Sequence, residues 1–463
     1  MIYRKTQKGA AFVISLIVLA ILSVWAVAIH SMSGANVQIA DNQRKGDSAR
    51  ACAESGTDVL RFWLSGVCMP GTTAASAKFG NLANFMENDV GELTANNITA
   101  DYNGDDLITI APVTLNSTMA QNFAAQISDI SAIEPNTIRV DVTGTYGPIS
   151  RIVRVNYEFG PRRNPLFDYG VATKGPLNLS GNIEMGGANI ELDSGVYIES
   201  EDANALSIIG NSSIAGEVDI TNPDAVVTLQ GGQASIGGET GQAAIDNHVN
   251  FDADQVPFPV PNPGYFWPYV QNTYDPNNVL SEYENVVIPA GTNPVFGAVT
   301  LKGVVFIEVP NVVTFTGNTD ITGIIVGNGD LNDNSGTNQI IFLGTVNSYP
   351  VTDLPYEPQF EHPDADRWLQ DEAGTFLMAP GFAASFGGDF ETLNGAIAAN
   401  GIEFFGNAGG TIDGSVINYS PNAMTLSGNN DLYFNCSATE MPAGFEMDIV
   451  LYYDSSSYSE VVL

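Results

Sequence analysis

The feature that most constrains this chain is an uncharged apolar run close to its N-terminus. Residues 10–29 contain no charged side chain, and a helix of about 20 apolar residues is long enough to span the hydrocarbon core of a bilayer. Several basic residues precede the run, so the positive-inside bias leaves the N-terminus in the cytoplasm and exports the rest of the chain. A cleaved secretory signal is the alternative, but its apolar core is shorter. The sequence therefore predicts a basic leader at 1–9 and a transmembrane helix at 10–30.

The same helix is predicted to continue beyond the membrane. Residues 31–66 contain no proline, and their apolar side chains recur at helical spacing, which is typical of an amphipathic helix packed on one face. Gly66 and Pro70 supply the signals that end a helix. The predicted extension covers 31–66, and its apolar stripe consists of Cys52, Gly56, Val59, Leu60, Trp63 and Leu64.

This N-terminal arrangement resembles a type IV pilin or pseudopilin, and in particular a PilX-type pilus assembly protein. The resemblance rests on the basic leader, Gly9, the apolar helix that starts Ala-Ala-Phe at Ala10, and the amphipathic extension. It implies that a prepilin peptidase cuts between Gly9 and Ala10 and that the new N-terminus is methylated. Ile14 occupies the fifth mature position, where most pilins carry glutamate. PilX-type proteins and the K-type minor pseudopilin also commonly lack this glutamate, so Ile14 favours a minor or tip-proximal subunit.

Residues 67–160 are predicted to form a small α/β part of the pilin-like kind. A helix is compatible with residues 79–93. Apolar and polar residues then alternate along 138–142 and again along 152–159, with a turn at 144–148 between them, which is the pattern of a β-hairpin. One long helix packed on a small antiparallel sheet is the arrangement that this pattern favours.

The chain is predicted to be all-β from residue 166 onward. Short apolar pairs alternate with Gly, Asn, Ser and Asp, which is typical of short strands between tight corners. We favour a right-handed parallel β-solenoid, loosely similar to bactofilins and other right-handed β-helices, over a β-sandwich. The predicted segments are solenoid at 166–250, a proline-rich and aromatic strap at 251–285, solenoid at 286–346, a loop at 347–375, and the solenoid end with C-terminal strands at 376–463.

The charge balance narrows the classes of function. The chain has 16 basic and 52 acidic residues, a formal net charge of -36, which argues against a nucleic-acid partner because phosphate binding needs clustered Lys and Arg. A polysaccharide lyase needs a basic side chain to abstract a proton, and Lys302 and Arg367 are the only basic residues after Lys174. We predict that the chain is not an enzyme and has no catalytic residues.

Two loops have oxygen-bearing side chains at alternate positions, as calcium-binding loops do. The first contains Asp101, Asn103 and Asp105, but Pro112 stands where an EF-hand has its bidentate Glu. The second loop contains Asp330, Asn332 and Asn334. Calcium is therefore a candidate cofactor, although a polar turn explains either pattern as well, since Asp and Asn hydrogen-bond their own backbone.

Together these observations favour a minor, tip-located subunit of a type IV pilus or related secretion system, with an acidic β-rich head displayed for adhesion or surface recognition. Its expected partners are other pilins or pseudopilins through the N-terminal helix, the inner membrane, a prepilin peptidase, and surface glycans. It would be a single-pass inner-membrane protein before assembly and would lie on the pilus or cell surface afterwards. The alternative is an anchored envelope β-solenoid that polymerises or binds carbohydrate outside any filament.

Overall fold

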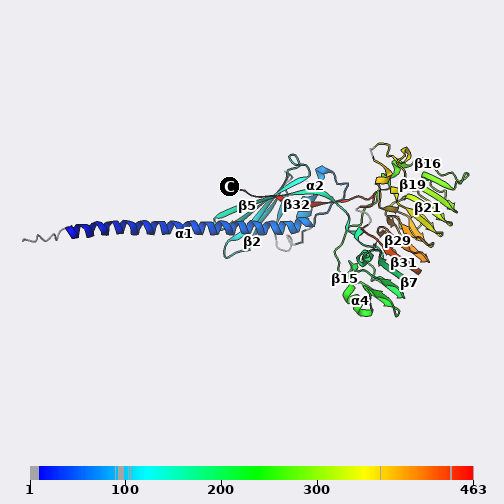
Figure 1. The fold of residues 1–463 in the computed structure, drawn as a ribbon, viewed down its shortest axis with the longest axis horizontal. Coiled ribbons are helices and arrows are strands. Elements are labelled where there is room, and N and C mark those ends of the chain that lie inside the picture. Colours follow the sequence, from blue (N-terminus) through cyan, green and yellow to red (C-terminus); the bar gives the residue numbers. More distant parts are fainter. Residues whose placement is uncertain are drawn as a thin grey trace, which may run out of the picture. The chain divides into compact units, whose positions relative to one another are not determined.

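The computed structural model describes residues 10–88, 90–91, 98–102, 104, 106–364, 367–437 and 441–461. The chain divides into two compact units (Figure 1). The first, which we call the body, contains residues 1–162 and 448–463. The second, the head, contains residues 163–447. The head is therefore inserted into the sequence of the body.

The body is built on one long helix, α1 (Ala10–Ser65), which confirms the predicted unbroken helix. Residues 11–40 are exposed on every side, whereas from Gly46 onward one face of the helix is buried. The buried positions recur at intervals of three and four residues, as expected for a helix lying on a sheet. A second helix, α2 (Ala75–Asn88), buries Phe79, Leu82, Ala83 and Met86.

The body sheet is antiparallel throughout, in the order β1-β2-β3-β4-β5-β32. Its inward side chains alternate along each strand and join α1 and α2 in one apolar core. The long helix lies beside this sheet in Figure 1. The strands are β1 (Ala100–Tyr102), β2 (Leu107–Asn116), β3 (Gln121–Asp129), β4 (Thr137–Tyr146), β5 (Ile149–Arg162) and β32 (Asp448–Val461).

Glycines set how closely α1 approaches this sheet. A Cβ atom added to Gly144 would lie 2.1 Å from the carbonyl oxygen of Ala49. One added to Gly56 would lie 2.6 Å from the ring of Phe123. Gly144 lies within β4, not at the start of a turn, so the predicted turn at 144–148 is shorter than expected. At Gly144 the backbone of β4 packs directly against the backbone of α1, so no larger side chain fits there.

The head consists of two large sheets of parallel strands. One antiparallel pair, β13 with β14, lies at the edge of the 14-stranded sheet. We call the 14-stranded sheet the open sheet. Its strands are β7 (Leu177–Gly187), β9 (Asn204–Gly210), β10 (Ser213–Ile214), β12 (Val226–Gln230), β13 (Ser235–Ile236), β14 (Glu239–Thr240), β18 (Val295–Phe296), β20 (Val312–Phe315), β22 (Gln339–Phe342), β25 (Ala383–Phe386), β26 (Thr392–Leu393), β28 (Ile402–Gly406), β29 (Gly410–Ile412) and β31 (Met424–Phe434).

We call the 12-stranded sheet the covered sheet. Its strands are β6 (Val171–Thr173), β8 (Val196–Ile198), β11 (Val218–Ile220), β15 (Val249–Phe251), β16 (Asn272–Thr273), β17 (Glu282–Ile288), β19 (Val299–Glu308), β21 (Thr319–Asn328), β23 (Val346–Tyr349), β24 (Thr375–Ala379), β27 (Ala396–Ala399) and β30 (Val416–Asn418). The parallel pairing of successive strands is that of a β-solenoid, and it decides against the alternative of a β-sandwich of antiparallel sheets.

The rungs of the solenoid do not follow sequence order. The chain enters at β6 and β7 and builds outward to helix α4 (Gly241–His248) and then β15, which ends that half. Residues 252–271 then lead to the opposite edge, where β16 and β17 begin a second half that builds back. This second half meets the first where β30 pairs with β6 and β31 pairs with β7. The first strands of the head in the sequence therefore pair with its last strands, in the middle of the solenoid.

Two apolar layers stabilise the head. The main core lies between the two sheets, and within it Phe296, Phe315, Phe342, Phe386 and Phe404 stack rung upon rung with ring centroids 4.9–5.3 Å apart. The second layer lies on the outer face of the covered sheet, where Phe266 and Tyr269 of the proline-rich strap are fully buried.

Short 3-10 segments shape the loops of this second layer and the rung corners: η1 (Pro165–Asp168), η2 (Glu191–Ser194), η3 (Pro263–Tyr265), η4 (Trp267–Tyr269), η5 (Val351–Asp353), η6 (Pro358–Phe360) and η7 (Leu369–Asp371).

Candidate functional site

The N-terminal half of α1 is the strongest candidate for a functional surface. Its large apolar side chains are exposed in the isolated chain: Phe12, Trp25 and Val27 are each 65–70% accessible. In the described part of the chain, this is the one helix long and apolar enough to cross a membrane. Such a surface is stable only in lipid or against other apolar helices.

The two hydroxyl groups within the apolar run 10–29, those of Ser15 and Ser23, are satisfied within the helix itself. The hydroxyl of Ser15 donates to the carbonyl of Phe12 at 2.8 Å, and that of Ser23 donates to the carbonyl of Leu19 at 2.7 Å. Hydroxyl groups that hydrogen-bond to a preceding carbonyl leave no unpaired donor in hydrocarbon. The local chemistry is therefore compatible with a membrane interior.

No carboxylate interrupts the apolar half. Ile14 is exposed on the helix surface, and the first charged residue after it is Asp41. Gly9 and the leader lie outside the described residues, and Ala10 is the first residue of α1. Cleavage between Gly9 and Ala10 therefore stays a prediction.

The two distal basic residues of the sequence are engaged in ion pairs. Lys302 lies on β19 and donates to Glu282 on the neighbouring strand β17 at 2.5 Å, and this hydrogen bond raises the pKa of Lys302. A lysine held as a cation is a poor proton acceptor. Arg367 donates to the hydroxyl of Tyr265 at 2.7 Å and lies 3.5 Å from Glu372. Both side chains thus tie neighbouring segments together.

The structure describes the two candidate calcium loops to different extents. Asn103 and Asp105 lie outside the described residues, while Asp101 lies on β1. In the second loop, Asp330 accepts hydrogen bonds from the backbone and side chain of Asn332, at 2.9 and 3.2 Å. Asn334 accepts one from buried Asn400 at 2.9 Å. Among the described residues no three His, Cys, Asp or Glu side chains gather as metal ligands do, and calcium here stays a prediction.

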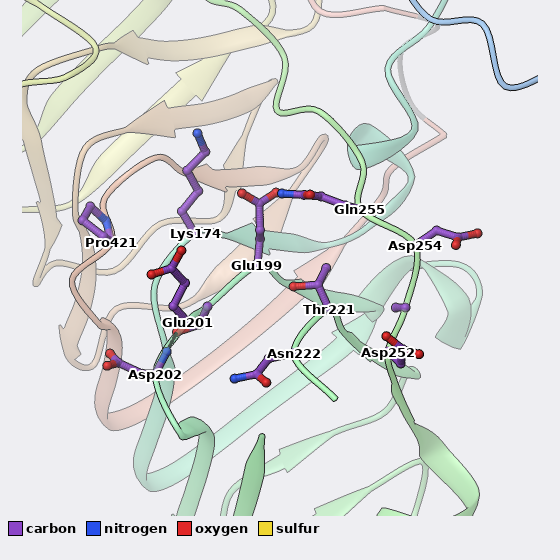
Figure 2. Close-up of a pocket in the computed structure, with 12 residues that line it drawn as sticks. Lys174, Glu199, Glu201, Asp202, Thr221, Asn222, Asp252, Asp254, Gln255 and Pro421 are labelled. Carbon is purple, nitrogen blue, oxygen red and sulfur yellow. Dashed lines mark hydrogen bonds between the residues drawn. The ribbon is translucent and has the colours of Figure 1, made fainter. Parts of the chain in front are cut away.

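An acidic hollow of about 1010 Å³ opens at the carboxyl ends of β6, β8, β11 and β15 (Figure 2). Rung register places Lys174, Glu199, Thr221 and Asp252 at equivalent positions directly after these strands. Lys174 lies 5.0 Å from the ring centroid of Phe258. The sequence did not indicate this cluster, because its members are far apart until the rungs align them. The carboxylates that line the hollow are Glu199, Glu201, Asp202, Asp252 and Asp254.

The helix and the body sheet define the class of the N-terminal part: it is a type IV pilin-like protein. The PilX N-terminal family matches residues 8–58, which span the apolar half of α1 and most of its buried half. The chain is therefore similar to PilX-type proteins over this segment. No curated protein matches the chain.

Two solved structures show a limited likeness to the chain. One is the competence-associated pilin ComZ from Thermus thermophilus, with 10% identity, 90% of this chain and 98% of that chain covered, and a TM-score of 0.26. The other is an ice-binding protein from the Antarctic ascomycete Antarctomyces psychrotrophicus, with 13% identity, 58% and 95% covered, and a TM-score of 0.18.

Proposed function

We propose that this protein is a minor, tip-located subunit of a type IV pilus or related secretion pseudopilus, which displays its head for adhesion or surface recognition. The observation that carries the proposal is the apolar helix surface that continues without a break into the helix of a folded body. Such a helix can be held by the inner membrane before assembly and by the helices of neighbouring pilins afterwards. The match of residues 8–58 to the PilX N-terminal family supports this reading.

The tip location is supported by two features of the chain. Ile14 replaces the glutamate that most pilins carry at this position, so the charged contact available to ordinary shaft subunits is missing. The head also contains more residues than the body that carries it. A subunit surrounded by neighbours along a shaft has little room for so large an insertion, whereas a subunit at the tip has fewer neighbours.

The experiment is immunogold labelling of sheared filaments that contain an epitope-tagged full-length chain. We expect gold at filament ends. In a strain that lacks the prepilin peptidase, or in the variant Gly9→Leu, the chain should stay in the inner membrane and filaments should be unlabelled. Gly80→Leu is the matched control, because Gly80 lies on α2, outside the apolar half of α1, and nothing lies within 4 Å of it. Label along the shaft would contradict the tip location. Filaments without label would favour the alternative of an envelope solenoid anchored outside any filament.

A further inference from the structure

The order of the rungs brings the beginning and the end of the head to the same place. Its first strands, β6 and β7, pair with its last strands, β30 and β31, and the side chain of Asn418 donates to Thr173 across this boundary at 2.9 Å. We call these two pairings the join. If the rungs followed sequence order, the first and last strands of the covered sheet would be separated by ten strand spacings of about 4.8 Å, or about 48 Å.

Further contacts hold the entry and exit segments of the head together. Arg163, the first residue of the head, donates to the backbone carbonyl of Cys436 at 2.9 Å. The rings of Phe167 and Phe445 pack edge to face, with centroids 5.1 Å apart. All four residues belong to the head. The folded head therefore brings its own two ends together, by contacts that do not involve the body.

The body sheet requires its two sequence segments to meet. The head is inserted between β5 and β32, and the residues that flank it, Arg162 and Asp448, are cross-strand partners. The Cα atoms of such partners are about 5 Å apart. β32 also completes the body core, since Ile449 is buried in it and the ring of Tyr453 lies 5.4 Å from that of Tyr157. Completion of the body therefore depends on the two ends of the inserted segment lying close together.

The folding state of the head changes the entropy of pairing β32 with β5. With the head unfolded, this pairing closes a flexible loop of about 285 residues. The probability of loop closure falls as the three-halves power of loop length, so such a loop closes about 150 times less readily than one of about ten residues. In the folded head the join already holds the ends together. A folded head therefore acts as a short connection between β5 and β32.

From this topology we propose that folding of the head controls completion of the body: β32 pairs stably with β5 only once the join has formed. The order of synthesis favours this sequence of events, because β1 to β5 precede the head and β32 follows it. A chain whose head is not folded keeps an unpaired edge at β5, and such edges pair with other chains.

The consequence for filaments rests on the proposed function. A subunit enters a filament through its body, so a body without β32 is excluded, and only subunits with a folded head are displayed. This consequence also gives the unusual order of rungs a role, because a solenoid built in sequence order would separate the two strands that the body has to pair.

The test is hydrogen exchange of the purified full-length chain in detergent. Gly181→Val opens the join, since a Cβ atom at Gly181 would lie 2.2 Å from the carbonyl oxygen of Gly428 on β31. The amides that link β5 to β32 should then exchange about a hundredfold faster, whereas those that link β3 to β4 should exchange as in the parent. Gly232→Val is the matched control, because nothing lies within 4 Å of Gly232, and it should leave all of these amides unchanged.

Two further measurements keep the test independent of one substitution. In a urea titration of the parent, the amides of the join and those between β5 and β32 should lose protection at the same urea concentration. Coupling between two equilibria is reciprocal, so Tyr453→Ala, which weakens the packing of β32, should also speed exchange at the join. Ser455→Ala is its control, because Ser455 is exposed in the irregular part of β32.

Either of two results would overturn the proposed coupling: β32 stays protected after the join has opened, or the join exchanges equally in Tyr453→Ala and the parent. Filament incorporation is scored separately. Gly181→Val should stay in the inner membrane and Gly232→Val should enter filaments, so Gly181→Val in filaments at the parental level would contradict the exclusion of chains with an open head. A parent chain that shows the coupling but is absent from filaments would contradict the proposed function and leave the coupling intact.

Discussion

At the scale of single residues, Gly144 is the position that most tightly constrains the body. A Cβ atom there would lie 2.1 Å from Ala49 O and 2.2 Å from Ala53 N, and both are backbone atoms of α1. Because neither can rotate away, Gly144→Ala must lift the helix from the sheet. Overpacking of this kind costs about 1–3 kcal/mol. We expect a loss of that size in the stability of the body, measured by hydrogen exchange of the β4 amides.

The control for this prediction is Gly80→Ala in α2, where a Cβ atom meets nothing within 4 Å. It should leave exchange unchanged or slow it slightly, since Ala favours helix over Gly by about 1 kcal/mol. Equal protection of β4 in the parent and in Gly144→Ala would show that the helix can shift without cost, contrary to the packing described here.

Residue-level features were predicted unevenly from the sequence. The stripe that includes Cys52, Leu60 and Trp63 could be predicted because helical periodicity marks a buried face. The role of Gly144 could not be predicted, because a glycine near Gly147 and Pro148 resembles part of a turn. Its close approach to α1 depends on a tertiary contact that has no local signal in the sequence.

At the scale of elements, one buried carboxylate, Glu372, binds two tyrosine side chains of the strap. Glu372 accepts hydrogen bonds from the hydroxyls of Tyr265 at 2.6 Å and Tyr269 at 3.4 Å, and it lies 3.5 Å from Arg367. Glu372→Ala would leave these donors without their acceptor, which costs about 1–3 kcal/mol. We expect a lower melting temperature of the head and faster proteolysis within the strap.

Glu361→Ala is the comparison for this element, because Glu361 is an exposed acid in the same loop region. Its melting temperature should match the parent within error. If Glu372→Ala also melted with the parent, the hydrogen bonds from Tyr265 and Tyr269 to Glu372 would contribute nothing to the stability of the strap.

The elements themselves were predictable, but their partners were not. Alternating apolar pairs indicated short strands and a solenoid, and parallel pairing confirms this. The order of rungs escaped prediction because β6 and β7 pair with β30 and β31, across contacts such as Asn418 to Thr173. The C-terminal strand β32 likewise pairs with β5 in the body sheet. Pairings between strands so far apart in the sequence cannot be predicted from periodicity. The alternation within a strand shows that one of its faces is buried, but not which strand it pairs with.

At the scale of the whole molecule, the chain combines two surfaces with different requirements. The apolar half of α1 needs lipid or other helices around it, whereas the acidic head needs an aqueous exterior. A filament subunit that is first held in the inner membrane and then displayed outside satisfies both requirements. The sequence predicted this division, because hydropathy and charge are properties of composition. The acidic hollow appears only once the rungs are aligned.

If α1 is the spine of a pilin-like subunit that is processed before assembly, the N-terminus of the mature chain must differ from that of the translated one. The intact mass of the purified chain, together with the sequence of its first peptide, measures this. The purified chain should begin at Ala10 with a methylated amine. An unprocessed chain that still begins at Met1, or one cut near Gly34 as a secretory signal would be, would contradict it.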